Sequence, residues 1–253
     1  MFKKSLLFIS VLTAVLLPSF EANSYRIYRI AVDDHYPPFS VFNRLANHVE
    51  GIDVDMTQAI CKMLNIECLI TSLDFPEGIE ALQDGQVDLV CSGPGFPLVR
   101  DERIIWSENY FRSTSVFVGL DKSVNEDFSQ TLKGLRIGAV QDSVQAEYLS
   151  RTYSQDTAVV EYKEFQDIMT ALILEEIDFG FVDIMATFYY FQTDRSLVFD
   201  IFGHPVNTGD GALLLMLEKE SEMMNKINSA IIELRSSDEY ETIAERYFDF
   251  FIF

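Results

Sequence analysis

Basic residues are scarce in this chain of 253 residues. It has 19 Lys and Arg residues against 40 Asp and Glu residues, which gives a formal net charge of -21. Nucleic acids and anionic lipid surfaces both require a basic protein surface for a sequence-independent grip. The charge therefore excludes nucleic-acid binding, and it leaves open a small or cationic partner.

Long apolar runs are also scarce. One run, residues 6–17, follows a lysine pair and is shorter than the roughly 20 residues that a membrane-spanning helix needs. The triplet Ala-Asn-Ser at 22–24 is typical of a signal-peptidase site. We predict a signal peptide over residues 1–24, cleaved near Ser24, and an exported periplasmic protein. A retained N-terminal anchor is the alternative.

The chain has three cysteines. Export makes a disulfide possible, and Cys61 and Cys68 lie where a chain reversal between a helix and a strand could bring them to bridging distance. Cys91 lies in an apolar strand pattern. We interpret it as a small core residue rather than a nucleophile, because buried thiols are usually inert.

Strand and helix patterns alternate twice along the chain. The first series has strands at 25–32, 68–72 and 87–91 and helices at 51–65 and 76–83. The second has strands at 132–140, 157–162 and 177–183 and helices at 142–151 and 164–176. Such alternation is typical of mostly parallel sheets flanked by helices.

Two α/β series predict two lobes rather than one sheet. The extended segments 111–119 and 205–217 are expected to cross between the lobes, and the helices at 220–248 to pack back on the first. We predict a first lobe of residues 25–114 and 208–253 and a second lobe of residues 115–207.

Ligands of open α/β sheets bind beyond the carboxyl ends of the strands. Four loops lie there: "DDHYPPF" at 33–39, "SGPGFPLVR" at 92–100, "QDSVQ" at 141–145, and the end of "IDFGFVD" at Asp183. A guanidinium at Arg100 and a carboxylate at Asp183 could hold an α-amino acid zwitterion. Taken alone, Arg100 is equally a surface arginine, and Asp183 is better explained as a helix N-cap.

Several longer stretches resemble one family. They are "YPPF", "GIDVDMTQAICKMLNIEC", "DFPEGIEALQDGQVDLVCSG", "WSENYF" after Arg100, "LKGLRIGAVQDSVQAEYL", "IDFGFVD" and "ELRSSDEYETIAERYFDF". Together they resemble the periplasmic amino-acid-binding proteins of ABC importers, solute-binding family 3, especially the lysine/arginine/ornithine- and histidine-binding branch. The cysteines at 61 and 68 have the spacing of that branch's pair, which implies a disulfide.

The resemblance implies a two-lobed α/β fold of the type II periplasmic-binding-protein class, each lobe a mostly parallel sheet flanked by helices. It implies a monomer that captures a small polar ligand between closing lobes and delivers it to an ABC permease in the inner membrane. The ligand class is an amino acid, and in this branch a basic one such as arginine, lysine or histidine. Neither a cofactor nor a metal nor an enzymatic activity is expected.

The resemblance also assigns the site. Arg100 falls on the arginine for the ligand carboxylate, Asp183 on the aspartate for its ammonium group, and Asp33 on a carboxylate for a cationic side chain. Tyr36 and Phe75 fall on an aromatic pair that sandwiches that side chain, in keeping with cation–π contact. The loop positions that complete the headgroup site are Ser92, Gly93, Gly95, Val144 and Gln145.

This chain departs from the family at the headgroup site. Relatives usually carry Ser or Thr at the positions of Gly93 and Gly95, Thr at that of Pro97, and a hydroxyl residue at that of Val144. The departures predict a weaker or water-mediated grip on the ligand, or a ligand that is not a standard amino acid.

Two other functions are compatible with the same fold. Cyclohexadienyl dehydratases resemble it, but they carry a glutamate soon after the aspartate that matches Asp183, and "DIMATFYYF" at 183–191 has none. A positioned acid or base is needed for such chemistry. A sensor or adhesion module, which differs in partner rather than in fold, is the third alternative.

Overall fold

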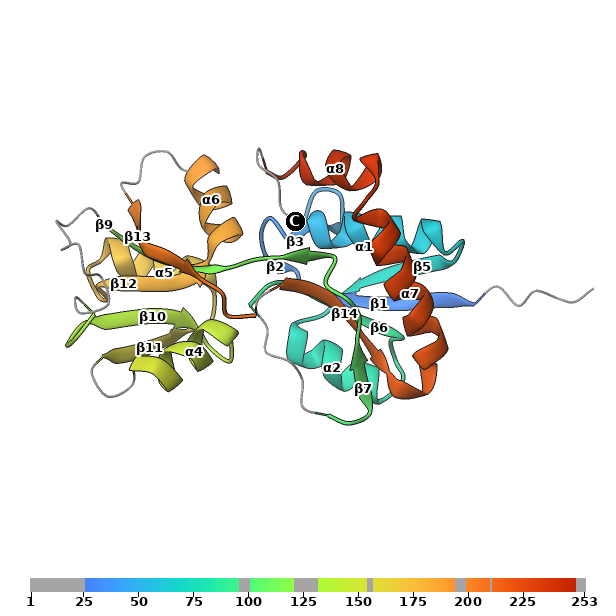
Figure 1. Cartoon of the computed structure of the whole chain (residues 1–253), viewed down its shortest axis with the longest axis horizontal. Helices are drawn as coiled ribbons and strands as arrows, with labels where there is room; N and C mark the ends of the chain where they lie inside the picture. Colours follow the sequence, from blue (N-terminus) through green and yellow to red (C-terminus); the bar gives the residue numbers. More distant parts are fainter. Residues whose placement is uncertain are drawn as a thin grey trace, which may run out of the picture.

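A computed structural model describes residues 26–95, 101–120, 132–153, 157–193, 199–209 and 211–248. The predicted signal peptide, Pro97 and Arg100 lie outside these residues. The described chain forms two α/β lobes, each built on its own sheet (Figure 1). We call them the first and the second lobe.

The first lobe contains a sheet in the order β5-β1-β6-β14-β7, with β8 paired to β14. Its strands are β1 (Ile27–Val32), β5 (Glu67–Ser72), β6 (Leu89–Ser92), β7 (Ile104–Trp106), β8 (Phe111–Arg112) and β14 (Gly211–Leu217). Strands β1, β5 and β6 are parallel, whereas β14 runs antiparallel to β6 and β7. The parallel strands are those that the first strand and helix series predicts.

Helices cover both sides of this sheet (Figure 1). They are α1 (Ile52–Met63), α2 (Phe75–Gln83), α7 (Ser221–Leu234) and α8 (Asp238–Ala244), with the short 3-10 helix η1 (Glu218–Glu220) before α7. Helix α1 buries Ile52, Met56 and Ile60 at helical spacing, and it contacts α7 and α8. The C-terminal helices therefore pack on the first lobe, as the sequence predicts.

A small antiparallel sheet of β2 (His35–Tyr36), β3 (Ser40–Asn43) and β4 (His48–Glu50) precedes α1. The sequence analysis does not predict it, because its strands are too short to show a hydrophobic period. This sheet matters for the site because β2 carries Tyr36.

The second lobe contains a sheet in the order β11-β10-β12-β9-β13. Its strands are β9 (Ser115–Leu120), β10 (Arg136–Val140), β11 (Ala158–Tyr162), β12 (Phe179–Asp183) and β13 (Phe199–Val206), and its described helices are α4 (Val144–Tyr153), α5 (Phe165–Ile173) and α6 (Ile184–Thr193). Strands β10, β11 and β12 are parallel, and β9 and β13 are antiparallel to their neighbours.

The chain crosses between the lobes twice, after β8 and again between β13 and β14 (Figure 1). Because β14 returns into the first sheet between β6 and β7, that sheet contains strands from both ends of the chain. Among the residues that the structure describes, no helix is both long and apolar enough to cross a membrane.

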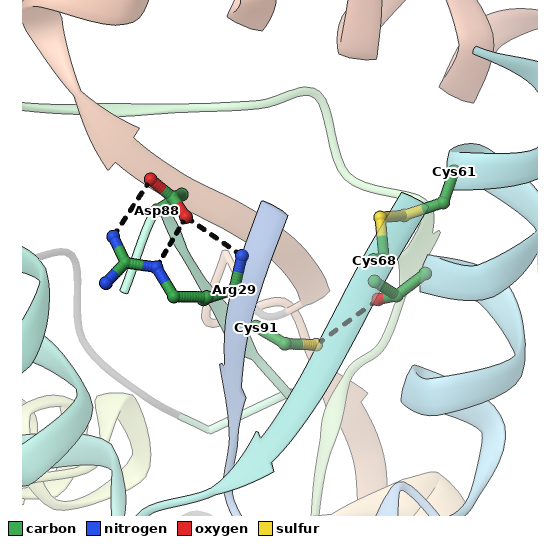
Figure 2. The surroundings of a disulfide bond; sticks show 6 residues. Arg29, Cys61, Cys68, Asp88 and Cys91 are labelled. Atoms are coloured by element: carbon green, nitrogen blue, oxygen red, sulfur yellow. Dashed lines mark hydrogen bonds and ion pairs between the residues drawn. A yellow bond between two sulfur atoms is a disulfide. The ribbon is translucent and has the colours of Figure 1, made fainter. Parts of the chain in front are cut away.

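The predicted disulfide is confirmed: Cys61 in α1 is bonded to Cys68 in β5 (Figure 2). Cys91 is a buried free thiol whose sulfur lies 3.0 Å from the Tyr110 hydroxyl. Burial raises the pKa of this thiol well above its usual value, which agrees with an unreactive core residue. Nearby, Arg29 Nε donates to Asp88 Oδ2 at 3.0 Å and ties β1 to the turn before β6 (Figure 2).

Candidate ligand-binding site

A cavity of about 560 Å³ lies between the two lobes, at the carboxyl ends of the parallel strands. Pockets of 300–1,000 Å³ that are lined by apolar and a few polar groups are typical of small-molecule sites. Six of the predicted site residues line the cavity: Asp33, Tyr36, Phe75, Gly95, Gln145 and Asp183. Gly93 and Val144 adjoin lining residues, Ser92 is the last residue of β6, and Arg100 lies outside the described residues.

Asp33 follows β1 directly, so the end of that strand places it in the cavity. Its Oδ1 accepts a hydrogen bond from the backbone N–H of His35 at 2.9 Å. Burial raises the pKa of this carboxyl, and backbone hydrogen bonds from His35 and Phe75 oppose the rise. A ligand cation beside Asp33 would favour its ionised form in the same way.

Tyr36 and Phe75 bring aromatic rings to the first-lobe side of the cavity. The Tyr36 ring packs 4.9 Å, centroid to centroid, from that of Phe39. Phe75 is the first residue of α2 and is buried. Phe165 and Phe181 line the second-lobe side, and the sequence analysis missed both because each lies in an ordinary apolar core pattern.

Asp183 is the last residue of β12 and only 1% exposed. Its Oδ1 accepts the N–H of Ala186 at 2.9 Å, which makes it the N-cap of α6, and its Oδ2 accepts a short hydrogen bond from the Ser113 hydroxyl. The structure thus shows the cap and also places the same residue in the cavity lining.

Gln145 connects the cavity to the crossing segments. Its Nε2 donates to Ser115 Oγ at 3.0 Å, and Ser115 Oγ lies 2.9 Å from Thr208 Oγ1 in the return crossing. Ser115 is fully buried and Gln145 is 3% exposed. Ser113 and Ser115 in the outward crossing therefore hold Asp183 and Gln145, and sequence reasoning missed this role although it identified the crossing as "FRSTSVFVG".

The local structure explains why glycine occupies both of these loop positions, 93 and 95. A Cβ on Gly93 would lie 2.9 Å from Oδ2 of Asp53, and Gly95 has φ of 100°, in the region that favours glycine. The Gly95 carbonyl accepts the backbone N–H of Val144 at 2.9 Å, a direct hydrogen bond between the lobes. The predicted helix-start donor at Val144 is thus already bonded to the first lobe.

Asp53, behind Gly93, is a buried carboxyl near the site whose pKa is raised. It is 1% exposed, and the Tyr110 hydroxyl donates to its Oδ1 at 2.8 Å. Burial raises its pKa to about 8, the Tyr110 hydrogen bond lowers it, and the nearby charge of Asp33 raises it further. A neutral, protonated Asp53 is therefore expected below that pH.

The described cavity lining is acidic. Its carboxylates are Asp33, Asp74, Glu80, Asp142, Glu164 and Asp183. Its basic side chains already lie near acids: Lys163 Nζ is 3.8 Å from Glu164 Oε1, and His35 Nδ1 is 3.5 Å from Asp74 Oδ1. The balance favours entry of a cation, because clefts lined by one sign of charge concentrate the opposite charge.

Residues 28–250 match the family described as bacterial extracellular solute-binding proteins, family 3. The "Lysine/arginine/ornithine-binding periplasmic protein" of Escherichia coli (strain K12) is 27% identical over 261 residues, which cover 99% of each chain. The "L-arginine-binding protein" of Pseudomonas aeruginosa is 26% identical over 257 residues, covering 99% of this chain and 98% of that one.

Solved structures agree on the fold. An ancestral arginine-binding protein bound to arginine matches with a TM-score of 0.75 at 23% identity, covering 88% of this chain and 99% of that chain. An arginine transport-system periplasmic binding protein from Legionella pneumophila matches with a TM-score of 0.74 at 22% identity, covering 87% and 99%. The predicted two-lobed, type II periplasmic-binding fold is confirmed.

Proposed function

Because the chain belongs to the bacterial extracellular solute-binding proteins of family 3, we propose that it captures a basic amino acid between its lobes in the periplasm. A monomer closes on the ligand and then delivers it to an ABC permease in the inner membrane. Closure of this kind needs hinges at the crossings, where Ser113, Ser115 and Thr208 lie.

The observation that carries this proposal is the position of Asp33 and Asp183. One comes from each lobe, and both line the same cavity. Asp183 suits an α-ammonium group and Asp33 a cationic side chain, since hydrogen bonds to charged groups are worth about 1.5–3 kcal/mol each. A ligand with two cationic groups thus favours the closed arrangement.

The aromatic rings support the same ligand class. Tyr36 and Phe75 line the cavity beside Asp33. A guanidinium or alkyl-ammonium group over such a ring gains about 0.5–2 kcal/mol. The names of several relatives, which are those of lysine-, arginine-, ornithine- and histidine-binding proteins, point in the same direction.

A binding role is favoured over the dehydratase alternative. The relatives are named as binding proteins, and no glutamate lies between Asp183 and Phe191. Turnover of prephenate or arogenate by the purified protein would reverse this ranking. Unchanged solute uptake after deletion of the gene would favour the sensor or adhesion alternative.

Titration calorimetry with arginine, lysine, ornithine, histidine and glutamine tests the ligand class. We expect binding of at least one cationic amino acid and weaker binding of glutamine. The matched variant Asp33→Asn keeps the side-chain shape and removes the charge, and it should weaken the cationic ligand about 10- to 100-fold, the value of one charged hydrogen bond. A heat of binding with glutamine and none with arginine, lysine, ornithine or histidine would contradict the proposal.

A further inference from the structure

The first turn of helix α4, in the second lobe, is joined to the first lobe by one backbone hydrogen bond. Ser143 is the N-cap of this helix, because its Oγ accepts the N–H of Ala146 at 3.1 Å. Val144 is therefore the first helical residue, and its N–H has no acceptor within its own helix. That N–H donates to the Gly95 carbonyl at 2.9 Å. Both groups belong to the protein backbone, so this bond needs no ligand to form.

Gly95 lies close to side chains of both lobes. A Cβ added at this position would lie 3.6 Å from Gln145 Oε1 in the second lobe and 4.0 Å from the Tyr36 hydroxyl in the first. The φ of Gly95 is 100°, a value that a residue with a side chain adopts only with strain. The loop conformation at this contact between the lobes is therefore one that glycine makes possible.

The same helix start is tied to the crossing segments. Gln145 Nε2 donates to Ser115 Oγ at 3.0 Å, and Ser115 Oγ lies 2.9 Å from Thr208 Oγ1. A hinge motion at the crossings would carry Gln145 and Ser115 together with the second lobe. The hydrogen bond between Val144 and Gly95 joins the second lobe directly to the first, so opening of the lobes would break it.

We propose that the hydrogen bond from Val144 to Gly95 is a latch that holds the two lobes together before a ligand enters. The protein then exchanges between a latched form, which predominates, and an open form. Only the open form admits a ligand to the cavity, so the rate of ligand entry is reduced by the fraction of the protein that is open. The latch is a property of the protein alone and does not depend on which ligand the cavity takes.

Amide hydrogen exchange tests the latch without any ligand. The protein is unfolded in guanidinium chloride with its disulfide intact, dialysed and refolded, so that no copurified ligand remains. We expect the Val144 amide to exchange about 10-fold more slowly than an unbonded amide, because only an acceptor outside the helix can protect it. The Glu147 amide, which donates to the Ser143 carbonyl at 3.0 Å, shows that the helix has formed. Exchange at Val144 as fast as that of an unbonded amide would overturn the inference.

Two variants of Val144 test the consequence of the latch for ligand entry. Val144→Pro removes the N–H at the first helical position, where proline is favourable, and Val144→Ala is the matched control that keeps the N–H. In stopped-flow measurements, arginine should associate about 2- to 13-fold faster with Val144→Pro than with Val144→Ala, the value of one neutral hydrogen bond. Equal association rates in the two folded variants would overturn the inference.

The kinetic test uses the ligand class of the proposed function, and the exchange test does not. If the wild-type protein bound none of arginine, lysine, ornithine and histidine, the proposed function would be rejected, and exchange at Val144 would still decide the latch. Binding of arginine together with fast exchange at Val144 would reject the latch and leave the proposed function standing.

Discussion

The two ends of the cavity differ in what they can offer a ligand. At the cation end, Asp33 presents a carboxylate, and Tyr36 and Phe75 present rings. At the headgroup end, the α4 donors are bonded to Gly95 and Val140. The difference teaches that a ligand would meet an acidic and aromatic surface at the first end and, at the start of α4, described donors that are already bonded within the protein.

Replacing Asp53, which lies behind the headgroup end, should have the largest effect of the variants considered. The quantity affected is the pH dependence of the free energy of unfolding. The folded pKa of Asp53, about 8, lies above the usual 3.8, so the folded state holds a proton that the unfolded state releases between those values. Its contribution to stability is complete below about pH 4 and is lost as the pH rises toward 8, at up to about 1.4 kcal/mol per pH unit.

The variant Asp53→Asn cannot titrate and should flatten this slope. Urea unfolding of both proteins at pH 5 and pH 8, without ligand, measures it. Asp33 is unchanged in both, so its own contribution differs only by its interaction with the charge of Asp53. The same slope in both proteins would mean that Asp53 is ionised at neutral pH.

Asp183→Asn separates the observed role of that residue as a helix cap from its proposed role as the partner of the ligand ammonium group. Asparagine caps helices as well as aspartate does, so the free energy of unfolding should fall by less than about 1 kcal/mol. Arginine affinity should fall about 10- to 100-fold because the charge is lost. Calorimetry and thermal unfolding measure both, with Asp183→Ala as the variant that also loses the cap. Unchanged affinity in Asp183→Asn would leave Asp183 as a cap alone.

Gly93→Ser introduces at the headgroup end the hydroxyl that the family resemblance implies for this position. The new Cβ would meet Asp53 Oδ2 at 2.9 Å, so the free energy of unfolding should fall by about 1–3 kcal/mol. Introducing the same change into Asp53→Ala removes the clashing atom and should cost less. Additive effects in this double-mutant cycle would show that Asp53 is not what requires glycine.

An effect of the same size is expected at the crossing. Ser115→Ala removes the hydroxyl between Gln145 and Thr208 and should lower the free energy of unfolding by about 1–3 kcal/mol, because two polar groups lose a partner. Thr208→Val keeps the bond from Gln145 and should cost less. Denaturant unfolding ranks the two variants, and the reverse order would place the important contact on the return crossing.

Much of the two-lobed fold could be predicted from the sequence, because apolar residues recur with a clear period along the strands and helices of both series. The crossings, the disulfide and the ends of β1 and β12 follow from those periods and from the family resemblance. The partners of the α4 donors could not be predicted, since the bond from Val144 to Gly95 joins residues far apart in the chain. The same holds for Asp53 behind Gly93, where only the fold reveals why the loop is bare.

Arginine and citrulline test the central claim most directly. Citrulline has nearly the shape of arginine but carries a neutral ureido group in place of the guanidinium, so only the charge at the Asp33 end changes. Calorimetry should show citrulline binding at least about 30-fold more weakly than arginine, the value of one charged hydrogen bond. Equal affinities would contradict the claim that the cavity selects its ligand by positive charge.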